Sequence, residues 1–79
     1  MHGSMLPLTE LPTGRRARLS LLAGERSFRR RLMELGLLPG TELCLVRRAD
    51  LGGVLEVEVR RSRVTLRAAE AGALMVSPV

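Results

Sequence analysis

Few side chains in this sequence of 79 residues could perform covalent or metal chemistry. Cys44 is the only cysteine and His2 the only histidine, whereas a structural zinc site needs four such ligands. His2 lies in residues 1–4, which we interpret as a vector-derived leader. Without it, Cys44 and the serines lack a histidine to act as general base. The sequence therefore predicts no catalytic residue, no metal ligand set and no cofactor, and the protein is not expected to be an enzyme.

The remaining polar patterns have structural interpretations. Glu56 and Glu58 share one face of an expected strand with Arg60 beside them, which favours a solvated charge ladder over a cation site. The pair Gly52-Gly53 lacks the lysine and the spacing of a phosphate-binding loop. Cys44 is expected to be a buried or half-buried apolar residue rather than a reactive thiol.

The charge balance indicates a binding protein. All 13 basic residues are arginines, set against eight acids, for a net charge of +5. Such a balance is compatible with nucleic acid, an acidic protein face or a membrane surface. Phe28 is the only aromatic residue, which weakens nucleic-acid binding because stacking platforms are missing. Nucleic-acid binding remains the alternative hypothesis.

Residues 29–41 (RRRLMELGLLPGT) form the stretch on which the rest of the chain depends. Phe28, Leu32 and Leu35 recur with helical spacing and define one apolar face. Ser27 is expected to cap the helix at its N-terminus, and Gly36 to end it in a left-handed conformation. Pro39-Gly40 then predicts a type II turn into the next strand.

Five short segments read as strands because apolar and polar residues alternate in them: residues 17–22, 41–48, 54–60, 63–67 and 73–77. In the first, Ala17, Leu19 and Leu21 are expected to face inward. Residues 68–71 suit one helical turn, and Leu8 and Leu11 are expected to pack against the body. Short strands separated by turn residues favour a small barrel over a flat sheet.

Three leucines lie in expected loops: Leu37, Leu38 and Leu51. They predict either an exposed apolar patch for a partner or side chains that plug the core.

Residues 5–79 are expected to form a single domain. A lone cysteine is simplest in a reducing compartment, and no apolar run approaches the roughly 20 residues of a membrane span.

The order of these signals resembles the FeoA family, small cytosolic proteins of bacterial ferrous iron uptake. The resemblance runs from residue 8 to residue 76. It is carried by Leu11-Pro12 and Gly14, an RL-x-x-LG-hydrophobic-x-PG-T core over residues 31–41, a strand ending in two arginines and Ala49, a Gly-Gly hairpin, a VEVR strand, and LR-x-x-EA over residues 66–71.

The resemblance implies an SH3-like barrel, so the expected fold is mainly β. It would have about five strands, one short α-helix inserted after the first strand and a helical turn before the last. The resemblance also implies an accessory to FeoB, the membrane permease for Fe(II) with a cytosolic GTP-binding domain. The protein would then be cytoplasmic, held at the inner face of the membrane by its partner.

The sequence departs from the family pattern in three ways. The family's usual hairpin prolines are missing near Asp50 and Val54. Its usual glycine is missing near Arg61, so Arg61 or Ser62 is expected to be strained. The chain is also unusually basic.

We expect a non-enzymatic module that contacts the permease through its loops, with leucines supplying apolar area and Arg31 and Arg48 pairing with partner acids. A weak homodimer and direct Fe(II) carriage are less favoured alternatives. The predicted partner-binding residues are Arg31, Leu35, Gly36, Leu37, Leu38, Pro39, Gly40, Arg48, Leu51, Gly52 and Gly53.

Overall fold

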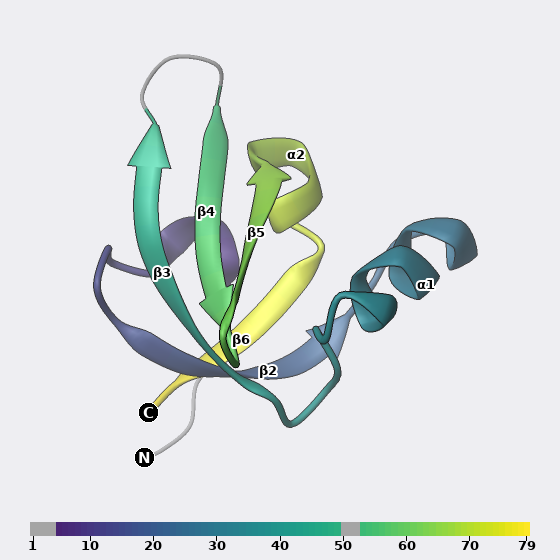
Figure 1. The fold of residues 1–79 in the computed structure, drawn as a ribbon, viewed down its shortest axis with the longest axis horizontal. Helices are drawn as coiled ribbons and strands as arrows, with labels where there is room; N and C mark the ends of the chain where they lie inside the picture. Colours follow the sequence, from purple (N-terminus) through teal and green to yellow (C-terminus); the bar gives the residue numbers. More distant parts are fainter. Residues whose placement is uncertain (1–4, 50–52) are drawn as a thin grey trace.

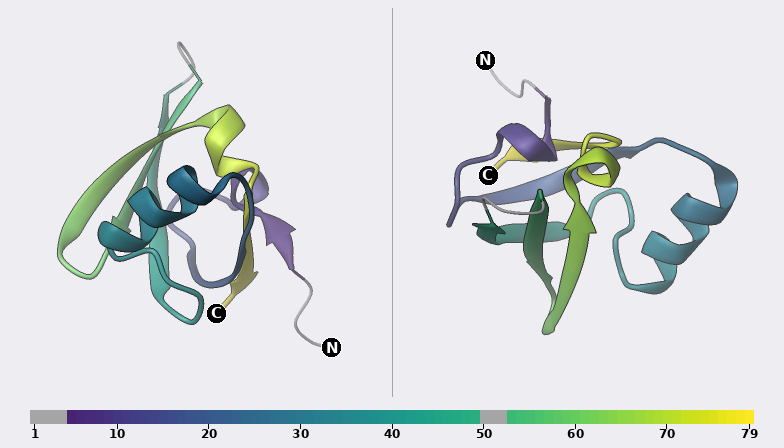
Figure 2. Two further views of the ribbon diagram at one scale, coloured as in Figure 1. Left: turned by 90° about the vertical axis from the view of Figure 1, so that its right-hand side faces the viewer. Right: turned by 90° about the horizontal axis from the view of Figure 1, so that it is seen from above.

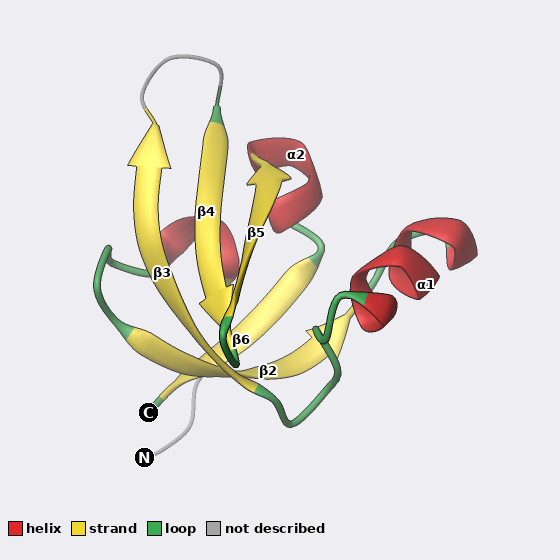
Figure 3. Cartoon of the chain, viewed as in Figure 1, coloured by secondary structure: helices red, strands yellow, loops and turns green. Residues whose placement is uncertain are grey.

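Alternating apolar residues build one antiparallel sheet of six strands (Figures 1 and 3). The computed structural model describes residues 5–49 and 53–79. The strands are β1 (Leu6–Pro7), β2 (Arg16–Leu22), β3 (Glu42–Ala49), β4 (Val54–Val59), β5 (Ser62–Arg67) and β6 (Leu74–Pro78). The helices are the 3-10 turn η1 (Leu8–Glu10), α1 (Arg26–Glu34) and α2 (Ala68–Ala71).

The sheet curls into a barrel that stays open along one line. The strand order is β1-β6-β2-β3-β4-β5, so β1 and β5 are the two edges and do not pair with each other. The short helix α2 contacts β5, β4 and η1, and thereby covers the open side. The helix α1 projects from the barrel between β2 and β3 (Figure 2).

The core is entirely aliphatic. Within the described residues no polar or charged side chain is buried, and the inward positions of each strand supply most of the core. The alternation predicted for β4 is confirmed, because Leu55, Val57 and Val59 are buried. Leu8 and Leu11 are also buried, as expected for the segment before β2.

The mainly β, SH3-like fold is thus confirmed, with corrections in its first part. The two-residue strand β1, which pairs with β6, was not predicted. Leu21 is 51% exposed rather than inward, because the register with β6 shifts between Leu19 and Leu21. This bulge places Leu22 in the core in place of Leu21.

The start of α1 also differs from the prediction. Glu25 is the N-cap residue and makes no side-chain capping bond, whereas Ser27 already lies inside the first turn. Gly24 has a φ of +103° and redirects the chain at the end of β2, so the helix begins earlier than the sequence pattern indicated.

The strained turn predicted near Arg61 lies one residue earlier. Arg60 is the one described non-glycine residue with positive φ, at 59°. It is the first of two residues between Val59 and Ser62, which pair across the β4–β5 hairpin. A left-handed conformation costs a residue with a Cβ about 1–2 kcal/mol.

Replacing Arg60 with glycine should therefore stabilise the protein. After allowance for the larger entropy of glycine in the unfolded chain, we expect the free energy of unfolding to rise by about 0.5–1 kcal/mol. Urea unfolding followed by circular dichroism measures this. Arg61→Gly is the matched control, since Arg61 does not have positive φ, and should destabilise. Equal effects of the two substitutions would contradict strain at Arg60.

Candidate functional site

The C-terminus of α1 is fixed to the barrel by a glycine and two buried leucines. The Leu37 amide donates to the Leu32 carbonyl oxygen at 2.9 Å, and the Gly36 amide donates to that of Met33 at 3.0 Å. With Gly36 at φ +101°, these are the two bonds of a Schellman motif. Leu32 and Leu37 are both fully buried. The left-handed glycine predicted at this position is confirmed.

The turn that follows is bonded to β2. The Thr41 amide donates to Leu38 at 2.9 Å and Gly40 has a φ of +93°, as expected for the predicted type II turn. The Gly40 amide donates to the Leu19 carbonyl oxygen at 2.7 Å, and the Leu19 amide donates to that of Thr41 at 2.9 Å. The joint between α1 and β3 is therefore held at both ends.

A groove of about 410 Å³ separates α1 from the edge of the barrel. The helix side contributes Leu32 and Leu35, and Leu35 is 47% exposed. The sequence pattern placed Leu35 on the buried face, but as the C-cap residue it lies beyond the last turn that packs on the core. The complete lining is Arg31, Leu32, Leu35, Val54, Thr65, Leu66, Arg67 and Glu70.

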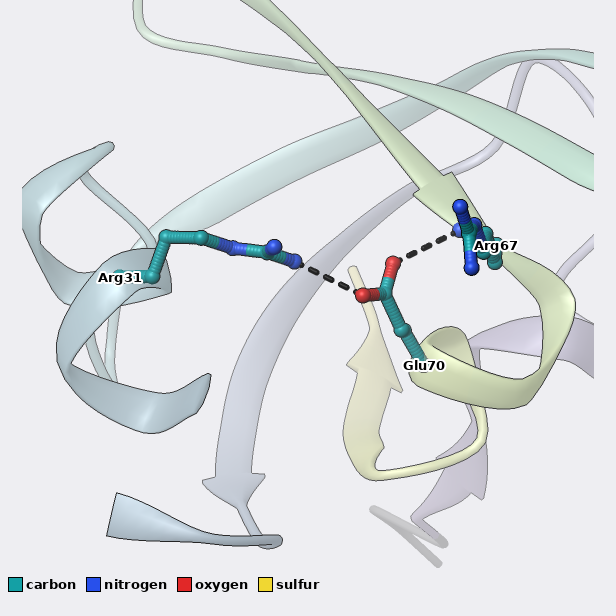
Figure 4. Close-up of polar contacts among 3 residues, drawn as sticks. All are labelled: Arg31, Arg67 and Glu70. Atoms are coloured by element: carbon teal, nitrogen blue, oxygen red, sulfur yellow. Dashed lines mark hydrogen bonds and ion pairs between the residues drawn. The ribbon is translucent and has the colours of Figure 1, made fainter. Parts of the chain in front are cut away.

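One ion pair crosses this groove (Figure 4). Nη2 of Arg31 donates to Oε2 of Glu70 at 2.9 Å, and the other carboxylate oxygen accepts from the Arg67 amide at 3.0 Å. Glu70 thus caps α2 while it holds α1. The guanidinium of Arg31 also lies 5.8 Å from the centre of the Phe28 ring, within cation–π range.

These contacts favour the charged form of the Glu70 carboxylate. The bond from the Arg67 amide, followed by the bond from Arg31, lowers the pKa of Glu70 from its ordinary value. The side chain is 28% exposed, so solvent weakens the pairing.

Leu37 and Leu38 do not together form an exposed apolar patch, which was one of the two expectations for the loop leucines. Leu37 is fully buried, because the Schellman motif turns it into the core; it plugs the core, and it cannot contact a partner directly. Leu38, Pro39 and Gly40 are exposed on the turn, and Leu38 retains 39% of its accessible surface.

Both arginines proposed to meet partner acids already have partners in this chain. Arg31 pairs with Glu70 as described above. Nη1 and Nη2 of Arg48 donate to the carbonyl oxygens of Thr9 at 2.8 Å and Leu11 at 2.7 Å. These carbonyl groups lie at the end of η1, where helical geometry leaves them without backbone donors. Arg48 thus fixes the N-terminal segment against β3.

The predicted hairpin tip does not join the turn at 36–40. Leu51 and Gly52 lie outside the described residues. Gly53, with φ +58°, is exposed and accepts from the Ala68 amide at 2.6 Å. The turn and the hairpin lie at opposite ends of β3, which at about 3.3 Å per residue are roughly 23 Å apart. Val54, next to Gly53, does reach the groove.

Sequence reasoning missed the half of the groove formed by Val54, Thr65, Leu66, Arg67 and Glu70. Four of these belong to β5 and α2, where the LR-x-x-EA pattern was recognised but was given no role. That pattern meets the RL-x-x-LG pattern of α1 through the Arg31–Glu70 pair. That these two patterns are in contact could not be predicted without knowledge of the fold.

Within the part of the chain that the structure describes, no three His, Cys, Asp or Glu side chains gather in a way that could hold a metal ion. A search of the same residues found no helix long and apolar enough to cross a membrane.

The fold and the groove define a class of protein: a small SH3-like barrel with an added helix and a groove between that helix and the barrel edge. Within that class, the sequence assigns the chain to one family. The family model of the FeoA domain matches residues 6–78, so the chain belongs to the FeoA family, as the sequence patterns predicted.

Solved structures agree with this assignment. FeoA from Chlorobium tepidum, determined by NMR in solution, is 39% identical, with a TM-score of 0.88 over 94% of this chain and 70% of that one. FeoA from Stenotrophomonas maltophilia, crystallised with zinc, is 35% identical, with a TM-score of 0.75 over 90% of this chain and 88% of that one. The latter is described as a unique prokaryotic SH3 domain protein and a candidate ferrous iron transport activating factor.

The fold extends beyond this family. A manganese-dependent transcriptional repressor has a TM-score of 0.89 over all of this chain but only 44% of its own length. Its identity of 16% shows a shared fold alone.

Burial separates the roles of the two adjacent leucines of the joint. Leu37→Ala should lower the free energy of unfolding by about 2–5 kcal/mol, since it leaves a cavity under α1. Leu38→Ala, at an exposed position, should change it by no more than about 0.5 kcal/mol. Urea unfolding of both variants tests this, and a Leu37 variant as stable as the Leu38 variant would show that Leu37 does not anchor the joint.

The lowered pKa of Glu70 predicts a pH dependence of stability. A carboxyl group whose pKa falls on folding stabilises above its unfolded pKa of about 4.3, and the effect is lost as pH falls through the folded pKa. Glu70→Gln can still accept from the Arg67 amide but loses the charge. We expect it to be less stable by up to about 1 kcal/mol at pH 7.

This deficit of the Glu70→Gln variant should shrink as the pH falls below the unfolded pKa of about 4.3 and disappear below the folded pKa. Unfolding curves of both proteins between pH 3 and pH 7 measure the difference. A deficit that stayed constant across this range would mean that the charge of Glu70 does not contribute.

Proposed function

We propose that this protein is a non-enzymatic accessory of bacterial ferrous iron uptake and that it docks on the cytosolic GTPase part of a FeoB-type permease. Membership of the FeoA family supports the transport role. The observation that carries the docking proposal is the groove between α1 and the barrel edge, where apolar surface is exposed and charged groups stand at the rim.

The groove offers apolar surface that the monomer does not cover. Leu35 is 47% exposed on one wall, and Leu38, beyond the helix, is 39% exposed. Because each of these leucines is already about half buried, a partner that buries the rest gains on the order of 1 kcal/mol from each. The volume of about 410 Å³ is enough for a few side chains of a docking segment.

The edge strand adds backbone groups to this surface. Among the described residues β5 pairs only with β4, so the part of its other edge that α2 does not cover can offer backbone groups to an extended partner segment. Such strand addition derives its affinity from main-chain hydrogen bonds and its specificity from side-chain pockets. The groove beside β5 supplies a pocket of this kind.

The ion pair sets the charge preference of the groove. Arg31 and Arg67 lie at its rim with a single acid, Glu70, between them. An acidic group of the partner can share Arg31, or take it from Glu70, at modest cost, because an exposed ion pair contributes only about 0–1 kcal/mol. The groove therefore suits a partner segment that combines apolar and acidic residues.

A binding assay with the soluble GTPase domain of the cognate permease tests the proposal. Leu35→Gln should weaken binding about fivefold or more, because the partner loses the apolar area of the exposed half of the side chain while the helix loses little. Met5→Gln is the matched control: Met5 is 52% exposed and directly precedes β1, which is the edge of the sheet opposite to β5. Its binding should equal that of the unmodified protein.

Circular dichroism confirms that both variants are folded, and rates of GTP hydrolysis with and without the protein show whether docking changes turnover. A folded Leu35→Gln variant that binds as tightly as Met5→Gln would show that the groove is not the docking surface. Absence of binding by the unmodified protein would contradict the proposal as a whole.

A further inference from the structure

We propose that the outer face of α1 binds the headgroups of anionic phospholipids and so brings the protein to the membrane surface without the aid of a protein partner. This inference does not rest on docking at the groove. It comes from four residues that together line a hollow on the outer surface of the helix, namely Arg26, Arg29, Arg30 and Met33.

The four residues form one row along the helix. Their spacing of i, i+3, i+4 and i+7 places them within about 100° of one another at 3.6 residues per turn. By the same geometry Phe28, Arg31 and Leu35 lie about 180° away, towards the barrel and the groove. The row therefore lies on the side of the helix away from the groove, on a helix that projects from the barrel (Figures 1 and 2). Arg26, Arg30 and Met33 are exposed, whereas Arg29 is half-buried and its Nε has no hydrogen-bond partner.

The arginines of this row form no ion pair within the described part of the chain. The ion pairs found there use Arg16, Arg31, Arg47 and Arg63, and none uses an arginine of the row. The first turn of α1 holds no acid, although Glu25 lies at the N-cap. Arg26 and Arg29 lie near the positive end of the helix dipole, where cations are mildly unfavourable, and an anionic surface would offset that cost.

The chemistry of the row favours lipid over nucleic acid. Sequence-independent binding of single strands relies on aromatic side chains on which bases stack, but the sequence has no Trp or Tyr, and Phe28 packs on the core. Met33, 39% exposed within the row, instead supplies an apolar group suited to the boundary between headgroups and acyl chains. A flat bilayer can also contact all four residues of a projecting helix at once.

The expected binding is weak and reversible. Each arginine near an anionic bilayer contributes on the order of a tenfold change or less in partitioning, and the effect is screened within a Debye length. A single short row cannot anchor a protein permanently. It can raise the local concentration at the membrane.

Sedimentation with vesicles tests the proposal, with the full chain and no permease present. The probes are vesicles of phosphatidylcholine alone and vesicles with 30% phosphatidylglycerol, at low and at moderate salt. The test variant is Arg26→Gln with Arg30→Gln, both exposed, and the matched control is Arg60→Gln with Arg61→Gln, also exposed and of equal charge change.

We expect binding to the anionic vesicles only, weaker at the higher salt, and reduced about tenfold or more in the Arg26/Arg30 variant but less than threefold in the Arg60/Arg61 control. Equal losses in the two variants would overturn the proposal, because net charge alone would then explain binding. So would absence of binding to anionic vesicles, or tighter binding of duplex DNA at equal phosphate concentration through the same two arginines. None of these outcomes depends on binding of the permease domain.

Discussion

The burial of Leu37 immediately after α1 is the constraint on which the rest of this structure depends. Gly36 takes the left-handed conformation that allows the chain to turn, and the hydrogen bonds of the Schellman motif then direct Leu37 into the core. Full burial of a leucine is worth about 1.5–3 kcal/mol, against at most about 1 kcal/mol for the exposed Arg31–Glu70 pair. The leucine anchors the helix, and the ion pair only adjusts its distance from β5 and α2.

Because burial of Leu37 contributes more than the Arg31–Glu70 ion pair, the groove does not depend on that ion pair. One wall is an edge strand held by its full pairing with β4, and the other is a helix whose C-terminus is fixed by apolar burial and by bonds from the turn to β2. If the ion pair breaks, for example when a partner acid competes for Arg31, both walls remain in place. The side chains at the rim can therefore exchange partners without loss of the fold.

Most of the fold could be predicted from the sequence, because one kind of residue dominates the core and its period is clear in each strand. The exceptions arise where a local irregularity overrides the period. A bulge exposes Leu21, and the early start of α1 leaves Ser27 without a capping role. Neither follows from alternation, since both depend on how β2 pairs with β6 and where its end redirects the chain.

The candidate site was less predictable, because its two walls are separated by about 30 residues in the sequence. Leu35 and Arg31 were among the predicted partner-binding residues and both line the groove, whereas their counterparts Glu70 and Leu66 were not predicted. The roles of the arginines were the hardest to predict from the sequence. Arg48 binds backbone carbonyl groups, Arg31 binds Glu70, and Arg26 forms no ion pair within the described residues, although all three look alike in sequence.

The helix α1 carries a different surface on each of its two sides. Its inner side closes the groove with Arg31 and Leu35, while its outer side carries the arginine row, about 180° away around the helix axis. A partner in the groove would therefore leave the row uncovered, and a membrane against the row would leave the groove open. If the proposed membrane permease occupies the groove, contact of both surfaces at once would fix the protein's orientation, which neither a weak basic row nor a small groove could do alone.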